Sequence, residues 1–218
     1  MKMAKCLGGR IFNFLFFVSC FLLCALCSML YASDSAGDEV ARIQKAYESI
    51  KDVKGDFVQK SYIRDLKRTD TYGGRFFIKP PRMKWEFSGD KPQSVYITAE
   101  DIIIYQKKEK QAIRAKFDRA TYGQAPIALL GGFGDINKEF DVSMKKGRLL
   151  LKPRKPMGII VQIELTLSDA AFPIETLSIL DTASNRIDIT LKDVRVNSGL
   201  GEKIFVFTPP EGVSVFQQ

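Results

Sequence analysis

The chain has 218 residues, with 33 Lys and Arg against 25 Asp and Glu, a net charge of +8 and no histidine. The absence of histidine excludes Ser-His-Asp and Cys-His catalysis, imidazole acid-base chemistry and histidine metal sites. An excess of basic residues suggests nucleic acid binding in a cytosolic protein, but the start of the chain indicates export.

The N-terminal residues have the pattern of a secretory signal peptide. Residues 1–10 carry three basic residues and no acid, residues 11–27 are almost entirely apolar, and small residues follow. The sequence therefore predicts a signal peptide over residues 1–32, with the exact cleavage site left open, and a single domain over residues 33–218. The alternative is a retained membrane anchor, although the apolar run is slightly shorter than the roughly 20 residues that a spanning helix needs.

Removal of this leader would change the chemistry of the remaining chain. All four cysteines lie within it, so the mature chain would have no disulfide, thiol nucleophile or thiolate metal site. The loss of Lys2, Lys5 and Arg10 would lower the net charge from +8 to +5. Outside the membrane, a basic surface suits anionic lipid or an acidic partner protein, or it only aids solubility; nucleic acid is not expected.

The first expected element of the domain is a helix in the stretch DEVARIQKAYESIKD, where Val40, Ile43, Tyr47 and Ile50 recur at helical spacing and Asp38 is in a position to cap it. Short strand patterns then follow almost to the end, separated by turns such as Lys145-Lys146-Gly147 and Ala183-Ser184-Asn185. The predicted strands are 53–63, 72–79, 82–88, 93–99, 102–106, 110–117, 140–145, 148–153, 159–168, 174–181, 186–196 and 203–208.

This pattern predicts a mainly β, α+β domain with an antiparallel sheet, because no crossover helices separate the strands. A short apolar helix is expected over residues 126–130 and another turn of helix from Asp135 to Glu139. Several strands are richer in apolar residues than a half-buried sheet needs; in residues 159–167, alternation places five of them on one face, from Ile159 and Val161 to Leu167. An ordinary core would also explain this excess.

No catalytic or metal-binding motif is recognisable. Asp135, Asn137 and Glu139 begin like a calcium loop, but Phe140 replaces its glycine and Lys146 its closing glutamate. A membrane-spanning β-barrel is disfavoured because charged residues occupy outward strand positions that lipid would contact. We therefore predict no enzyme activity, no cofactor and no metal.

Four motifs, in the same order along the chain, resemble the LolA family of periplasmic lipoprotein carriers. Gly55 to Gln59 is similar to the family's G-x-F-x-Q strand. Gly74 to Pro80, followed by Met83-Lys84-Trp85-Glu86-Phe87, is similar to its G-x-F-x-(I/V)-K-x-P and R-W-x-(Y/F) segments. The central stretch around Leu129-Leu130-Gly131-Gly132 and the ending Phe205 to Val213 also resemble the family.

The resemblance implies an open antiparallel half-barrel of about eleven strands, with short helices covering its concave face. It implies binding of the acyl chains of lipoproteins released by an inner-membrane ABC transporter, and their transfer to an outer-membrane acceptor. It also implies a monomer in the periplasm. The residues expected to line the acyl pocket are Phe76, Ile78, Trp85, Ile97, Ile104, Leu129 and Leu130.

In the family a basic residue near the Lys-Pro step tethers the lid, and the resemblance implies that the matching position here is Lys79, or Pro80 if the gap falls one residue away. Lys79 is therefore expected to contact the lid or a partner. Lysine is a point donor, whereas arginine presents a planar fork, so a lid held by Lys79 should be looser. Two alternatives remain: a lipid-sensing domain of the same fold that regulates a membrane signalling protein, and a hydrolase of unknown type. The sensor predicts that deletion leaves lipoprotein sorting intact; the hydrolase predicts clustered carboxylates in the cleft.

Overall fold

The computed structural model describes residues 35–118, 130 and 134–218 of the chain. Ala36–Gln218 form one compact unit. The expected signal peptide lies outside the described residues, and so does the expected helix over residues 126–130, except for Leu130.

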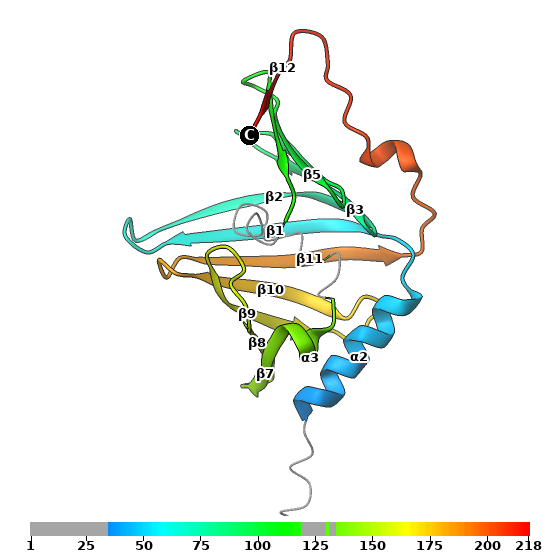
Figure 1. Ribbon diagram of the computed structural model, residues 1–218, viewed down its shortest axis with the longest axis vertical. Helices are drawn as coiled ribbons and strands as arrows, with labels where there is room; N and C mark the ends of the chain where they lie inside the picture. The colour runs from blue at the N-terminus through cyan, green and yellow to red at the C-terminus, as the bar shows by residue number, and fades with distance from the viewer. Residues whose placement is uncertain (1–34, 119–129, 131–133) are drawn as a thin grey trace, which may run out of the picture. The chain divides into compact units, whose positions relative to one another are not determined.

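The described residues form one twelve-stranded sheet, two helices and a 3-10 helix (Figure 1). The helices are α2 (Ser35–Ser49) and α3 (Ile136–Glu139), and the 3-10 helix is η3 (Glu202–Phe205). The strands are β1 (Val53–Ile63), β2 (Arg68–Lys79), β3 (Arg82–Ser88), β4 (Gln93–Ile97), β5 (Asp101–Gln106), β6 (Gln111–Lys116), β7 (Phe140–Lys145), β8 (Arg148–Pro153), β9 (Ile160–Leu167), β10 (Ile174–Asp181), β11 (Arg186–Val196) and β12 (Ser214–Gln217).

Two antiparallel meanders make up eleven strands of the sheet, and β12 adds to β6 in parallel. The strand order is β12-β6-β5-β4-β3-β2-β1-β11-β10-β9-β8-β7, so β1 and β11 join the meander β1–β6 to the meander β7–β11. The two end strands of this order are β12 and β7, and the sheet is open. Figure 1 shows the strand direction changing steeply between β11 and β5, as the twist of a large sheet requires. The predicted antiparallel, open, mainly β fold is confirmed, with twelve strands where about eleven were expected.

The hairpin turns follow from residues that tolerate a positive φ. Lys146 and Gly147 between β7 and β8 have φ of 51° and 73°, the pair of values that a two-residue type I′ turn requires. Ser184, between β10 and β11, has φ of 61°. Both turns are where the sequence predicted them, and they set the strand register that places apolar side chains on one face.

Helix α2 packs on the core through the predicted apolar stripe. Val40 and Ile43 are fully buried, and Ala36, one turn earlier on the same stripe, is also buried. The helix therefore begins at Ser35, which places Asp38 inside its first turn, and the prediction that Asp38 caps the helix was wrong. A carboxylate in the first turn still interacts favourably with the helix dipole.

One strand prediction was wrong, and one predicted strand has a different face from the one expected. Residues 203–208 were expected to form a strand, but Glu202–Phe205 are a 3-10 helix and residues 206–208 belong to no strand. The single apolar face of residues 159–167 is interrupted, because a register shift near Ile160 leaves Ile159 49% and Val161 39% exposed. Beyond the shift, Ile163 and Leu165 are fully buried as expected.

Candidate functional site

The candidate site is the face of the sheet that carries Phe57, Phe76 and Trp85, which we call the inner face. Strand pairing aligns its side chains in rows across β2 to β6. One row consists of Phe76, Trp85, Val95, Ile104 and Ile113, and the next of Ile78, Met83, Ile97, Ile102 and Ala115. Both rows are apolar throughout, so the inner face of this meander is a continuous hydrocarbon surface.

An aromatic cluster occupies the centre of the inner face. The ring of Phe76 stacks on Trp85 with centroids 5.1 Å apart and planes inclined by 20°, and Phe57 meets Trp85 edge-on at 4.6 Å. Phe57 also meets Phe87 edge-on at 5.0 Å. Each such pair contributes roughly 0.5–1.5 kcal/mol beyond the burial of its area, so the cluster fixes the separation of β1, β2 and β3.

The structure brings most of the predicted pocket residues together. Phe76, Trp85 and Ile104 lie in one inner-face row, and Ile78 and Ile97 lie in the next. All of these are fully buried except Ile104, which is half-buried against the core. Leu130 is fully buried in the same core, and its carbonyl accepts a hydrogen bond from the Tyr47 hydroxyl at 3.1 Å. Leu129 lies outside the described residues.

Burial of Tyr47 has an electrostatic consequence. The hydroxyl lies at the junction of α2 and Leu130, and removal from water raises the pKa of Tyr47 well above its ordinary range. Tyr47 therefore stays neutral and keeps donating its hydrogen bond across the whole physiological pH range.

Lys79 connects the end of β2 to the C-terminal segment, which we define as residues 200–217. Its Nζ donates to the Leu200 carbonyl at 3.0 Å and lies 2.8 Å from Glu202 Oε1. Arg82 forms an ion pair with the other carboxylate oxygen of Glu202. Between Lys79 and Arg82 in the sequence is the Pro80-Pro81 turn, whose peptide bond is cis. The role of Lys79 in holding a lid stays a prediction; the described contacts of Lys79 are with the C-terminal segment.

The start of the C-terminal segment is fixed by a buried carboxylate. Asp52 is 4% exposed, and its side chain accepts hydrogen bonds from the backbone N–H groups of Ser198, Gly199 and Leu200 at 2.7, 2.9 and 3.2 Å. Three such bonds satisfy a buried charge. The sequence reasoning missed Asp52, and a lone aspartate before a strand carried no signal for it.

The C-terminal segment then lies against the opposite, outer face of the sheet. The ring of Phe207 lies between Tyr96 and Tyr105, with centroid distances of 5.3 and 5.4 Å. Beyond it, β12 pairs in parallel with β6, where Val215 is opposite Ala112 and Phe216 opposite Ile113. This crossing explains why residues 203–208 form no strand: they cross the outer face, where there is no strand edge to pair with.

Charged residues of β2 and β3 also lie on the outer face. Glu86 pairs with Lys84 at 2.7 Å and with Arg75 at 2.8 Å. Partial burial raises the pKa of Glu86, but the hydrogen bond and charge of Lys84 and then those of Arg75 outweigh burial, so the pKa lies below its ordinary value. These charges are on the side opposite Trp85, which leaves the inner face without them.

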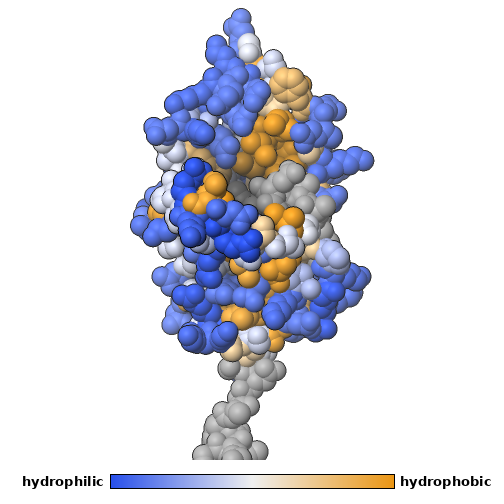
Figure 2. Space-filling model, turned by 90° about the vertical axis from the view of Figure 1, so that its left-hand side faces the viewer, coloured by the Kyte–Doolittle hydropathy of each residue, from blue (hydrophilic) through white to orange (hydrophobic). Residues whose placement is uncertain are grey.

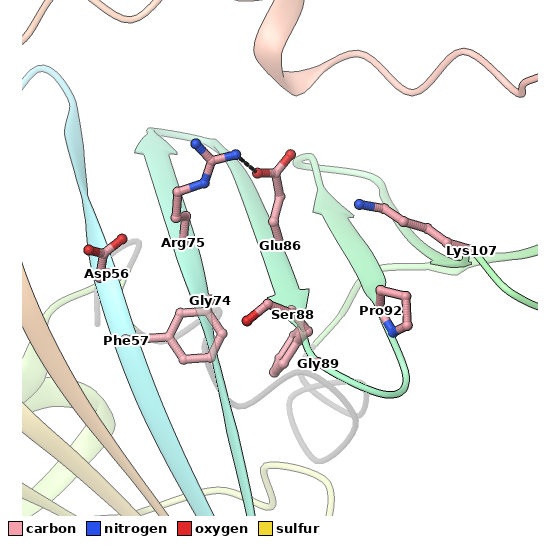
Figure 3. A pocket seen from close by; sticks show the side chains of 10 residues that line it. Asp56, Phe57, Gly74, Arg75, Glu86, Ser88, Gly89, Pro92 and Lys107 are labelled. Atoms are coloured by element: carbon pink, nitrogen blue, oxygen red, sulfur yellow. Dashed lines mark hydrogen bonds and ion pairs between the residues drawn. The ribbon is translucent and has the colours of Figure 1, made fainter.

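A hollow of about 660 Å³ lies beside the ends of β3 and β4 (Figure 3). Figure 3 shows Arg75 and Glu86 joined to each other on neighbouring strands, with Lys107 across the hollow near Pro92. Phe57 and Phe87 also line the hollow, but their rings belong to the aromatic cluster of the inner face, whereas Arg75 and Glu86 lie on the outer face. The charged side chains of the hollow are therefore on the face of the sheet opposite Trp85.

Some large hydrophobic side chains remain on the surface. Tyr62, Leu66 and Tyr72 of the β1–β2 hairpin are 40%, 62% and 37% exposed. Figure 2, which views the side where this hairpin ends, shows hydrophobic side chains gathered among strongly hydrophilic ones.

Within residues 35–118, 130 and 134–218, no cluster of His, Cys, Asp and Glu could hold a metal ion. None of the helices in these ranges is long and apolar enough to cross a membrane.

Comparison with known proteins defines the class of this chain. The family described as Outer membrane lipoprotein carrier protein LolA matches residues 48–208. The chain therefore belongs to the LolA family, as the sequence motifs indicated.

Individual relatives agree with this assignment. An outer-membrane lipoprotein carrier protein of Bordetella avium is 29% identical over 209 residues, which cover 91% of this chain and 95% of the relative. One from Halorhodospira halophila is 26% identical over 191 residues, which cover 87% and 90%. A crystal structure of an uncharacterized conserved protein from Thermus thermophilus has the same fold, with a TM-score of 0.53, 14% identity and coverage of 84% of this chain and 98% of that one.

Proposed function

We propose that this chain is a periplasmic carrier that binds the acyl chains of lipoproteins and takes them from the inner toward the outer membrane. The observation that carries the proposal is the continuous apolar inner face of β2 to β6, whose aromatic centre contains no charged group. Membership of a family whose relatives are named outer-membrane lipoprotein carrier proteins supports the same activity.

The physical demand on such a carrier matches this surface. A lipid anchor gains roughly 0.8 kcal/mol for each CH₂ group that leaves water, so an acyl chain does not cross an aqueous compartment unprotected. Shape and apolar area suffice for binding, and no covalent bond is made or broken. A chain without histidine meets these requirements, and we propose that it is not an enzyme.

Entry of an acyl chain requires movement. Phe76 and Trp85 are fully buried, so a ligand reaches them only when the segments that cover them move away. The proposed partners are the acylated lipoproteins, an inner-membrane ABC transporter that releases them and an outer-membrane acceptor. Because the sheet is open at both end strands, it can widen without breaking strand pairs.

The test is recovery of bound lipoprotein from the periplasm. The tagged chain is purified without detergent and its ligands are identified by mass spectrometry; triacylated protein is the expected finding. Ile104→Gln places an amide on the half-buried part of the inner face and should lower the recovery about 5–30-fold, since it removes roughly 1–2 kcal/mol of apolar contact. Val161→Gln, at a 39% exposed position of β9, is the control and should leave recovery unchanged.

Two results would contradict the proposal. One is purification of the folded chain with no acylated molecule under any condition. The other is normal lipoprotein sorting in a strain that lacks the chain, which is the behaviour expected of a lipid sensor.

A further inference from the structure

The indole N–H of Trp85 is a buried donor that finds no acceptor among the described residues. Trp85 is 0% exposed, and its Nε1 atom has no hydrogen-bond partner in the described structure. An unsatisfied buried donor costs roughly 1–3 kcal/mol. Buried tryptophans usually direct this group at an acceptor, so this exception at the centre of the candidate site indicates a specific use.

The side chains of the two inner-face rows offer Trp85 no oxygen. Val95 is opposite Trp85 on β4, and Phe76 is opposite it on β2. Phe76 stacks nearly parallel to the indole, so its ring meets the indole face and not the N–H edge. Phe57, inclined by 63°, is the one ring among these contacts that could receive the N–H as a weak π acceptor.

The position needs apolar area, which a phenylalanine also provides. What tryptophan adds is a single neutral donor within a hydrocarbon surface. A ligand that fills this surface and also accepts one hydrogen bond would remove the cost of the orphan donor when it binds.

The acceptor should be neutral. Lys84 and Arg75 are paired with Glu86 on the outer face, so neither is available to balance an anion beside the indole. A carboxylate there would lose its hydration with only one hydrogen bond in return. An ester or amide carbonyl loses much less hydration free energy on burial. In an acylated molecule, such a carbonyl is attached directly to the hydrocarbon chain.

We infer that Trp85 Nε1–H donates a hydrogen bond to an acyl ester carbonyl of the bound lipid, so that the site selects ester-linked acyl chains over equally apolar ether-linked or free-acid ones. This inference rests on the proposed function, because it names the group of the acyl ligand that the inner face recognises. Trp85 thereby acts as a specificity residue within an otherwise featureless apolar surface.

The experiment uses the fact that the chain has a single tryptophan. The ¹⁵N-labelled indole gives one resonance, which is followed during titration with dioctanoylglycerol and with its ether analogue dioctylglycerol. The ester should shift the indole proton downfield and the ether should not. Trp85→Phe should weaken ester binding about tenfold and ether binding less than about threefold, the size of one hydrogen bond. Octanoate should bind more weakly than either.

Each other outcome rejects the inference in a recognisable way. If both probes bind and Trp85→Phe weakens them equally, the indole contributes only area and its N–H points at Phe57. If neither probe binds the wild-type chain, acyl binding itself fails, and the proposed function fails with it. Replacement of Trp85 by benzothienylalanine, which has sulfur in place of N–H in the same shape, separates the lost hydrogen bond from any folding defect of Trp85→Phe.

Discussion

The Lys79 ammonium lies 2.8 Å from Glu202 Oε1, and this contact joins the end of β2 to the C-terminal segment. With the Leu200 carbonyl and Arg82 it forms a small network at the Pro80-Pro81 turn. The same strand, β2, carries Phe76 and Ile78 on the inner face. The C-terminal segment is therefore attached to β2 at a point near the inner-face residues of the candidate acyl site.

Replacement of Glu202 by glutamine should loosen the C-terminal segment without unfolding the domain. The substitution removes the charge that Lys79 and Arg82 share, whereas the Asp52 and Phe207 contacts remain. Because these are partly exposed ion pairs, we expect only a small increase, about twofold to threefold, in the rate of tryptic cleavage after Lys203. Glu211→Gln, at an exposed site in the same segment, is the matched control. Equal cleavage rates for both variants would show that the network does not hold the segment.

Acid should release the same contact. The hydrogen bond from Lys79 and the charges of Arg82 and Lys79 lower the pKa of Glu202 below its ordinary value. A carboxylate with a lowered pKa contributes stability above the ordinary pKa and loses it as the pH falls through the lowered value, which for Glu202 lies in the acid range below the ordinary glutamate pKa. NMR titration of the Glu202 carboxyl carbon measures this directly. In Lys79→Met the midpoint should move upward, and an unchanged midpoint would argue against the contact.

Gly74 shows why the Gly-x-Phe motif of β2 needs its glycine. A Cβ atom added at Gly74 would lie 1.9 Å from the Glu86 carbonyl oxygen on β3, which is too close for any side chain. Gly74→Ala should therefore push β2 away from β3 and destabilise the domain by about 3 kcal/mol or more in urea unfolding. At the adjacent Gly73 the nearest atom is 3.6 Å away. Gly73→Ala should change stability by less than about 1 kcal/mol, and similar losses for the two variants would refute this explanation.

The sequence predicted features that follow from the alternation of side chains along one strand. It missed features that depend on contacts with segments far away in the sequence. Alternation in residues 82–88 was enough to place Met83, Trp85 and Phe87 on one face, and the structure confirms this, since all three are buried. The inner-face rows follow from such alternation once neighbouring strands are paired in register. Strand pairing cannot show whether a buried side chain touches ligand or only core, so the assignment of pocket residues stays a prediction.

The wrong strand over residues 203–208 and the missed strand β12 share one cause. Residues 203–208 have a strand-like composition, but they cross the outer face, where Phe207 packs against Tyr96 and Tyr105 instead of pairing with an edge. Residues 214–217 carry little strand signal, yet they form β12 because the edge of β6 is open to them. Local sequence encodes propensity, whereas the available edge decides which segment becomes a strand.

Asp52 is expected to be the most sensitive carboxylate of the fold. In Asp52→Ala, three backbone N–H groups at residues 198–200 lose a charged acceptor in a buried site, which should cost about 2–4 kcal/mol of unfolding free energy. Asp56→Ala, at an exposed position of the same strand region, should cost less than about 0.5 kcal/mol. Urea unfolding followed by Trp85 fluorescence measures both, and a loss well under that range for Asp52→Ala would contradict the anchoring role.

Phe207 should determine whether β12 stays on the sheet edge. All four residues of β12 are exposed, so the strand buries little of its own surface and depends on the ring between Tyr96 and Tyr105. Phe207→Ala removes two aromatic contacts worth roughly 0.5–1.5 kcal/mol each. Hydrogen exchange at the β12 amides should then accelerate about fivefold or more, while exchange in β1 and β11 stays unchanged, because the centre of the sheet is not involved. Val206→Ala, at a 61% exposed neighbour, is the control. If β12 exchanges at the same rate in both variants, its strand hydrogen bonds to β6 hold it without Phe207, and the C-terminal segment is fixed at its two ends alone.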